Sequence, residues 1–384
     1  MPDATPIVLT LDANADPTAA AELARVFLEL GVECTLMLSA STAATMTADH
    51  PLTNVCKRLD VGLVDRELTE PDSSTPGVFQ KRFEKLHDAV LFPTGRLPSV
   101  YLCPGFAHGA YATLTEVNIR AVMTLEPIAP LTGAYFLGGR LHLQPATSVE
   151  SLTTEAEIES AVDRISSLAS HGESADPVMI ALPTNASAVR EATLSTFLKR
   201  LMEASSFAVC SVRQTADLLA DVPYDHAIPI AAITAMALHA AKGDLTPYQY
   251  ALGWLSPAEQ LYILAHVWSV ALEKGKAPRN SQTRTPMPTL DDPVESTATT
   301  ISAPEFPAVI SQLVASTSSK NELPAGVSME SGVVAVQDLL PSLATSLSSM
   351  PTPTDLTVVR GAAMFAPELV GFGRLAWTYK PATR

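Results

Sequence analysis

The stretch Val61–Leu125 begins VGLVDREL, continues FQKRFEKLHDAVLFPTGRLPSVYLC and ends in AVMTL. Short apolar runs at its start, in its middle and at its end predict buried strands. Between the first two runs, the apolar residues of Pro76–Leu91 recur at helical spacing, which predicts an amphipathic helix. Strands that alternate with helices in this way indicate a parallel sheet covered by helices.

The same alternation extends to both sides of this stretch. Pro6–Leu11 is an apolar run of the buried-strand type. Asp16 and Pro17 form a helix start signal, and Gly31 is a typical residue just after a helix end. Further strand–helix units continue to about residue 220. This repetition predicts an α/β fold, a distorted or incomplete (β/α) barrel, with a doubly wound sheet as the alternative.

The composition changes after Val222, where alanine-rich and amphipathic helical segments follow one another. Ser256 and Pro257 predict the start of a strong helix, and Gly275 its end. Residues 282–304 are rich in Thr, Pro and Ser, which predicts a linker or a long surface loop. We therefore expect an α/β domain over residues 1–222 and a mostly helical domain over residues 223–384.

The net charge of −15 argues against nucleic acid and anionic membranes as partners, because an acidic surface repels phosphates. The four cysteines are widely spaced, so we expect reduced, partly buried thiols. The apolar runs are too short to span a bilayer. The first residues show neither the basic nor the apolar part of a secretory signal, which predicts a cytoplasmic location.

Residues 6–220 resemble the polysaccharide deacetylases of the NodB type. The resemblance rests on the order of the predicted elements, on the opening IVLTLDAN and on the stretch GRLPSVYLCPGFAHGAYATL. It implies a NodB-type barrel in which one aspartate and two histidines hold a divalent metal that activates water. A second aspartate would accept the water proton, and an arginine would follow in a later strand.

Most of that chemistry is missing at the matching positions. Asp12 stands where the family has its proposed base. The family's metal-binding aspartate, its two histidines, its arginine and its late histidine are replaced by Ala13, Val64, Leu68, Leu102 and Pro183. Because alanine, valine and leucine offer no donor atom, this set cannot coordinate zinc. The resemblance thus implies the fold without its metal or any other cofactor.

A second alignment leaves one histidine in place. It matches the family's histidine motif to TADHPLTN, with His50 retained and Met46 at the first position. The alternative is therefore an active hydrolase with an unusual site made of Asp12, His50 and His108, holding a divalent metal such as zinc. Asp12 and His108 both follow predicted strands, where barrel sites form. Asp12 is equally suited to capping the next turn through Asn14.

The sequence thus predicts a catalytically inactive deacetylase-like protein, a structural or binding subunit of an assembly rather than an enzyme. The resemblance implies a binding cleft made of Asp12, Val64, Leu68, Leu102 and His108. Protein partners or self-association would use the helical C-terminal domain. Carbohydrate binding without turnover is a further alternative, with a glycan as the ligand.

Overall fold

The computed structural model describes residues 4–68, 76–104, 113–114, 117, 119–124, 134–143, 147–171, 177–185, 187–204, 207–219, 227–251, 253–288, 294–361 and 376–382. The chain divides into two compact units. The first comprises residues 1–135, 140–220 and 382–384, and the second comprises residues 136–139 and 221–381.

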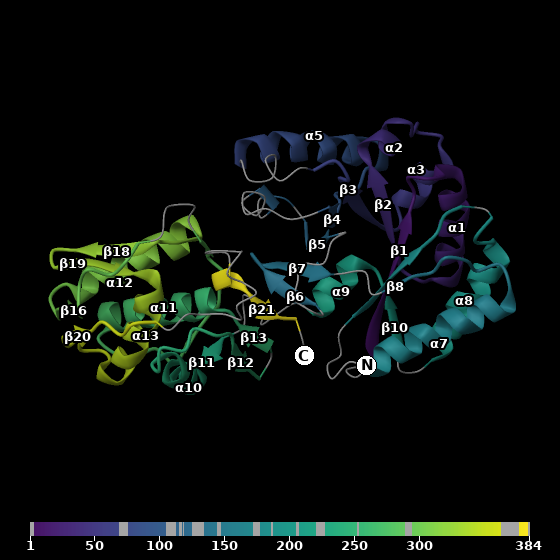
Figure 1. The fold of residues 1–384 in the computed structure, drawn as a ribbon. Helices are drawn as coiled ribbons and strands as arrows, with labels where there is room; N and C mark the ends of the chain where they lie inside the picture. Colours follow the sequence, from purple (N-terminus) through teal and green to yellow (C-terminus); the bar gives the residue numbers. More distant parts are fainter. Residues whose placement is uncertain are drawn as a thin grey trace. The chain divides into compact units, whose positions relative to one another are not determined.

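The first unit is built on a parallel sheet (Figure 1). Its strands are β1 (Thr5–Asp12), β2 (Thr35–Ser39), β3 (Asp60–Val64), β4 (Val100–Cys103), β5 (Ala121–Thr124), β7 (Arg140–Leu143), β8 (Thr147–Ser148), β9 (Val178–Leu182) and β10 (Phe207–Cys210). They follow the spatial order β7-β5-β4-β3-β2-β1-β9-β8, and β10 pairs with the first half of β1. The pairings among these strands are parallel.

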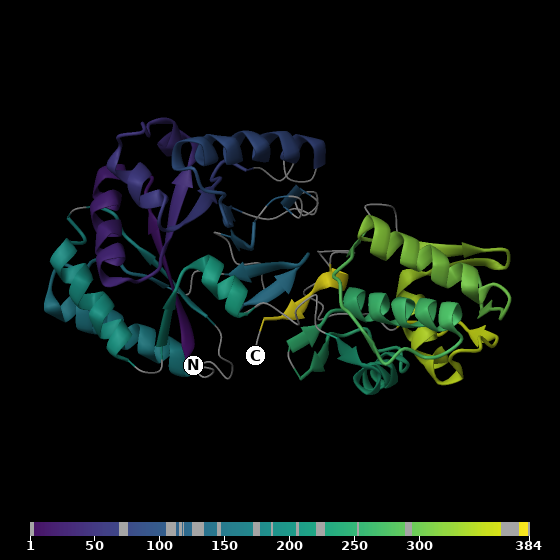
Figure 2. The same ribbon diagram turned by 180° about the vertical axis from the view of Figure 1, so that it is seen from behind.

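Helices surround the outer side of this sheet, as Figures 1 and 2 show. They are α1 (Pro17–Leu30), α2 (Ala40–Ala44), α3 (Pro51–Cys56), α5 (Pro76–Thr94), α7 (Glu155–His171) and α8 (Glu191–Glu203). The short helix α9 (Val212–Leu218) contacts both β1 and β5, although β2, β3 and β4 lie between these two strands in the sheet. A single short helix reaches both strands only because the sheet curls. The fold is therefore the predicted incomplete α/β barrel.

Local sequence signals position the first of these elements. The Asp16 side chain accepts hydrogen bonds from the backbone N–H groups of Thr18 and Ala19 at the start of α1, as predicted. Gly31 ends the helix with a φ of 67°, a conformation that glycine adopts without steric cost. The strand predicted over Val32–Ser39 begins later, at Thr35, because the N–H group of Val32 still bonds to the last turn of the helix.

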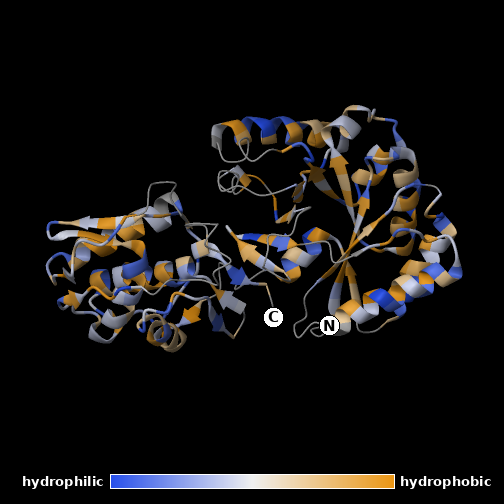
Figure 3. Ribbon diagram, in the orientation of Figure 1, coloured by the Kyte–Doolittle hydropathy of each residue, from blue (hydrophilic) through white to orange (hydrophobic). Residues whose placement is uncertain are grey.

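The core of the first unit lies between the sheet and its outer helices. The strands are mostly hydrophobic, whereas the covering helices carry hydrophilic stretches (Figure 3). All four cysteines are free and buried, deeper than the partly buried position predicted from the sequence. Within the described ranges, no helix has the length and apolar character needed to cross a membrane.

The second unit is mainly helical, as predicted, with α10 (Ile230–Ala240), α11 (Pro257–Lys274), α12 (Phe306–Val314), a π-helix (Ala315–Lys320) and α13 (Val336–Ser346). Five two-stranded pairs accompany the helices in its described part: β11 (Ile228–Pro229) with β14 (Asn280–Ser281), β12 (Tyr248–Tyr250) with β13 (Gly253–Leu255), β15 (Met287–Pro288) with β17 (Glu322–Leu323), β16 (Thr300–Ile301) with β20 (Leu356–Thr357), and β18 (Gly326–Met329) with β19 (Gly332–Ala335). Near the chain end, β21 (Lys380–Pro381) lies beside β6 (Tyr135–Leu137).

Helix α11 is the centre of this unit. It contacts α10, α12 and α13, and its Trp268 packs edge-on against Phe306 with ring centroids 4.6 Å apart. The predicted start at Ser256 and end at Gly275 are both confirmed. The Thr- and Pro-rich segment 282–304 lies within the second unit, and its Thr283, Thr285 and Ile301 are buried. Its polar composition suggested exposure, but hydroxyl groups that find partners can be buried.

Candidate functional site

Three of the positions singled out by the resemblance, Asp12, Val64 and Leu102, lie at or next to strand ends on the C-terminal edge of the curled sheet. In the strand register, Val64 at the end of β3 stands opposite Ser39 of β2 and Leu102 of β4. The hydroxyl of Thr184, just after β9, donates to the carbonyl oxygen of Asp12 over 2.6 Å. Neighbouring parallel strands end at the same edge, which is why residues far apart in sequence meet here.

Both oxygens of the Asp12 carboxylate have partners among neighbouring groups. One oxygen accepts hydrogen bonds from the backbone N–H and the side-chain amide of Asn14, over 3.0 and 2.6 Å. The other oxygen forms an ion pair with Arg66 over 2.5 Å. The Asp12 side chain is 37% exposed and that of Arg66 is 58% exposed. Asp12 therefore caps the turn, as one of its two predicted roles required, and also binds an arginine that the sequence did not single out.

Asn14 fixes this turn against the next strand and helix. Its side-chain oxygen accepts hydrogen bonds from the backbone N–H of Ser39 over 2.7 Å and from the hydroxyl of Thr42 over 2.8 Å. Its amide also donates to the carbonyl oxygen of Met37 over 3.2 Å. The loop after β1 is thus held in one conformation by groups from β2 and α2.

A second carboxylate, Asp65, forms the buried part of the site. It accepts two hydrogen bonds from the Arg82 guanidinium, over 2.7 and 2.5 Å, and one from the Tyr101 hydroxyl over 3.1 Å. The Asp65 side chain is only 2% exposed. Burial raises the pKa of Tyr101, so the phenol remains a donor. A bidentate arginine pair of this kind fixes α5, which carries Arg82, against the end of β3.

These side chains line a pocket of about 310 Å³. Its walls comprise Asn14, Ser39, Ala40, Ser41, Val64, Asp65, Arg66, Glu67, Arg82 and Leu86. Of the predicted cleft residues in the described ranges, only Val64 lines it. Leu68 and Leu102 are buried, at 8% and 7% exposure, and His108 lies outside the described residues. Asp12 does not line the pocket itself, but it contacts Arg66 and Asn14, which do.

The residues present do not fit the metal that the resemblance implies. Ala13, Val64, Leu68 and Leu102 are buried and carry only carbon in their side chains. Across the described part of the chain, no three His, Cys, Asp or Glu side chains gather closely enough to hold a metal ion. Zinc binds nitrogen, sulfur or oxygen donors, so this first alignment leaves it without ligands.

The second alignment offers His50, which has a local partner. His50 caps α3, and its Nδ1 accepts a hydrogen bond from the backbone N–H of Leu52 over 3.2 Å. Met46, at the other histidine position, is 7% exposed and packs into the core. The proposed grouping of Asp12, His50 and His108 stays untested, because His108 lies outside the described residues.

No protein-family model matches the chain, and no curated protein matches it significantly. Several solved structures are similar to it. A family 4 acetyl xylan esterase from Clostridium thermocellum, with a cobalt ion, is 12% identical and covers 56% of this chain and 91% of its own, with a TM-score of 0.38.

A CE4 family pseudoenzyme from Bacillus anthracis is 11% identical and covers 57% of this chain and 67% of its own, with a TM-score of 0.37. A family 4 carbohydrate esterase from Streptomyces lividans, with acetate, is 12% identical, with coverages of 53% and 90% and a TM-score of 0.33. The chain resembles polysaccharide deacetylases. Likeness at this level says nothing about activity, which depends on the chain's own residues.

Proposed function

We propose that the first unit is a deacetylase-like domain without deacetylase chemistry, and that the protein serves as a structural or binding subunit of an assembly. The observation that carries this proposal is the apolar pair Val64 and Leu102. They are neighbours across β3 and β4, at the positions of a histidine and the arginine in the family that the chain resembles. Their burial supports a role in packing.

The state of Asp12 supports the same proposal. A general base acts on a water that is held within its hydrogen-bond reach, and in the family that the chain resembles a metal ion holds that water. Here one oxygen of Asp12 belongs to the Asn14 turn and the other faces the Arg66 guanidinium. In our proposal, Arg66 supplies the positive charge beside Asp12 that a metal ion would otherwise supply.

Binding through the second unit and a cytoplasmic location belong to the proposal as well. The second unit has its own buried core around α11, so it is suited to dock onto a partner as a preformed body. Light scattering and native mass spectrometry on the full chain test the assembly role. A chain that stays monomeric and recovers no partner from its own cells would contradict it.

The absence of deacetylase chemistry is tested on protein purified in the presence of zinc and cobalt. We expect no stoichiometric metal and no turnover of acetylated chito-oligosaccharides. Stoichiometric metal, together with deacetylation that is lost in His50→Ala, would sink the proposal and favour the unusual hydrolase site. Tight binding of the same oligosaccharides without turnover would favour a carbohydrate-binding domain over a purely structural one.

A further inference from the structure

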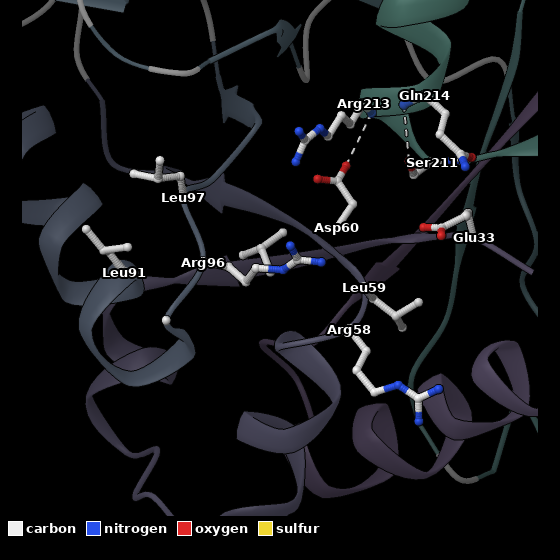
Figure 4. A pocket seen from close by; sticks show the side chains of 12 residues that line it. Glu33, Arg58, Leu59, Asp60, Leu91, Arg96, Leu97, Ser211, Arg213 and Gln214 are labelled. Carbon is white, nitrogen blue, oxygen red and sulfur yellow. Dashed lines mark hydrogen bonds between the residues drawn. The ribbon is translucent and has the colours of Figure 1, made fainter.

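A larger pocket lies at the opposite edge of the same sheet, where β2, β3 and β4 begin. Its volume is about 500 Å³, which is within the range of small-molecule sites. Glu33 before β2, Arg58 before β3 and Arg96 before β4 line it, together with Arg213 of α9 (Figure 4). It therefore shares no residue with the candidate site around Asp12.

Asp60 builds the floor of this pocket. Its carboxylate accepts hydrogen bonds from the hydroxyls of Thr35 and Ser99, over 2.9 and 2.6 Å, and from the backbone N–H of Arg213 over 3.2 Å. Thr35 in turn accepts a hydrogen bond from the backbone N–H of Val212 over 2.9 Å. These bonds fix the start of α9 to the first residues of β2 and β3. Asp60 is thus satisfied within the protein and has a structural role.

The three arginines of the pocket have no carboxylate partner in the described part of the chain. None of the guanidinium groups of Arg58, Arg96 and Arg213 lies within 4.0 Å of a described carboxylate oxygen. Figure 4 shows the Arg96 side chain extending toward the middle of the pocket, and the Glu33 carboxylate lies beyond its guanidinium group. Burial and the nearby charge of Asp60 raise the pKa of Glu33, whereas the charges of Arg96 and Arg213 lower it, so both guanidinium groups act on the position of the Glu33 carboxylate.

We propose that this pocket binds a small anionic molecule, a carboxylate or a phosphate monoester, through Arg96 and Arg213. Arg58 adds positive charge at the rim, and Glu33 accepts a hydrogen bond from a hydroxyl or amino group of the same ligand. Leu91 and Leu97, which also line the pocket, contact the apolar part of the ligand.

Two physical arguments carry the proposal. A guanidinium presents paired N–H donors that match the two oxygens of a carboxylate or phosphate. The chain as a whole has a net charge of −15 and repels anions at long range, so an anion that binds must be held by a local group of cations. The pocket provides that group at the end of the sheet away from Asp12, so this inference does not depend on the proposed function.

The test is a titration of the full chain at constant ionic strength, with inorganic phosphate in one arm and acetate in the other. Calorimetry and thermal unfolding both report binding. We expect saturable binding in at least one arm, which assigns the ligand to the phosphate or the carboxylate class. Arg96→Gln and Arg213→Gln should each weaken it about tenfold or more, since each removes a charged hydrogen-bond donor.

The matched control is Arg25→Gln, which removes the same charge from the exposed face of α1, outside the pocket. It should leave the affinity unchanged, and Glu33→Gln should strengthen it, because one negative charge leaves the pocket. The proposal is overturned if neither anion saturates, or if Arg25→Gln weakens binding as much as Arg96→Gln. Circular dichroism of each variant confirms that it is folded, and Glu33→Gln keeps the test decisive if an arginine variant unfolds.

Discussion

Each unit contains an ion pair, and the two pairs have almost the same length but very different exposure to solvent. Asp12 and Arg66 meet over 2.5 Å at the edge of the first unit, with side chains 37% and 58% exposed. Glu259 and Lys380 meet over 2.6 Å in the second unit, where both side chains are 2% exposed. Solvent can screen the first pair, whereas both side chains of the second are shielded from solvent. Burial, rather than distance, therefore decides how strongly the loss of one partner changes the free energy of unfolding.

The buried pair joins three distant segments. One Glu259 oxygen accepts hydrogen bonds from the backbone N–H and hydroxyl of Ser256, over 2.8 and 3.1 Å. The other accepts from the Thr285 hydroxyl over 2.5 Å and from the Lys380 ammonium. Burial raises the pKa of Glu259 to about 7 and lowers that of Lys380. The pair ties the segment around Lys380 to the start of α11.

The largest expected effect comes from breaking this buried pair. Lys380→Met leaves the Glu259 carboxylate buried without its cation, so we expect the second unit to lose about 3–5 kcal/mol of stability at neutral pH. All three tryptophans, Trp254, Trp268 and Trp377, lie in the second unit, so tryptophan fluorescence during urea unfolding reports on it alone. The double variant Glu259→Gln/Lys380→Met should lose less stability than Lys380→Met alone. An equal or greater loss in the double variant would contradict this account.

Lys380→Met should also change how the stability of the second unit depends on pH. In Lys380→Met the Glu259 carboxyl should stay buried, and burial is what raises its pKa above the usual 4.5. A raised carboxyl pKa costs nothing below the unfolded-state value and destabilises increasingly as pH rises toward the folded-state value. Lys380→Met should therefore lose about 1.4 kcal/mol per pH unit between about pH 4.5 and 7.

In the unchanged protein, the Lys380 ammonium lies 2.6 Å from the same carboxylate and compensates its charge when Glu259 ionises. Over the same pH range, the unchanged protein should therefore lose stability less steeply than Lys380→Met. Urea titrations of both proteins at several pH values measure the difference. A Lys380→Met profile parallel to that of the unchanged protein would show that Glu259 is hydrated in the variant.

The smallest expected effect comes from the exposed pair. Arg66→Gln should change the stability of the first unit by less than about 1 kcal/mol, because both partners are hydrated already. Thermal unfolding followed by far-UV circular dichroism measures it, with Arg82→Gln as the matched comparison. Arg82 binds the buried Asp65 through two hydrogen bonds, so its loss should cost more. Equal effects would show that burial does not separate these two pairs.

Much of the first unit was predictable because the signals are local. The cap at Asp16, the helix end at Gly31 and the alternation of strands and helices all depend on neighbours in sequence. The positions matched at Asp12, Val64 and Leu102 did gather at one edge, because strand order and direction place them there. The partners of these positions were not predictable. Nothing in the residues around Asp12 indicates that Arg66 pairs with it.

Residue type alone sets the periodicity, the helix ends and the absence of ligand atoms at Ala13, Val64, Leu68 and Leu102. Which charges are compensated depends instead on how the chain folds. Lys380 meets Glu259 across 121 positions, and Arg58, Arg96 and Arg213 converge on one pocket from separate segments. The physical reason is that electrostatic energy depends on burial and on distance in space, and the folded chain fixes both.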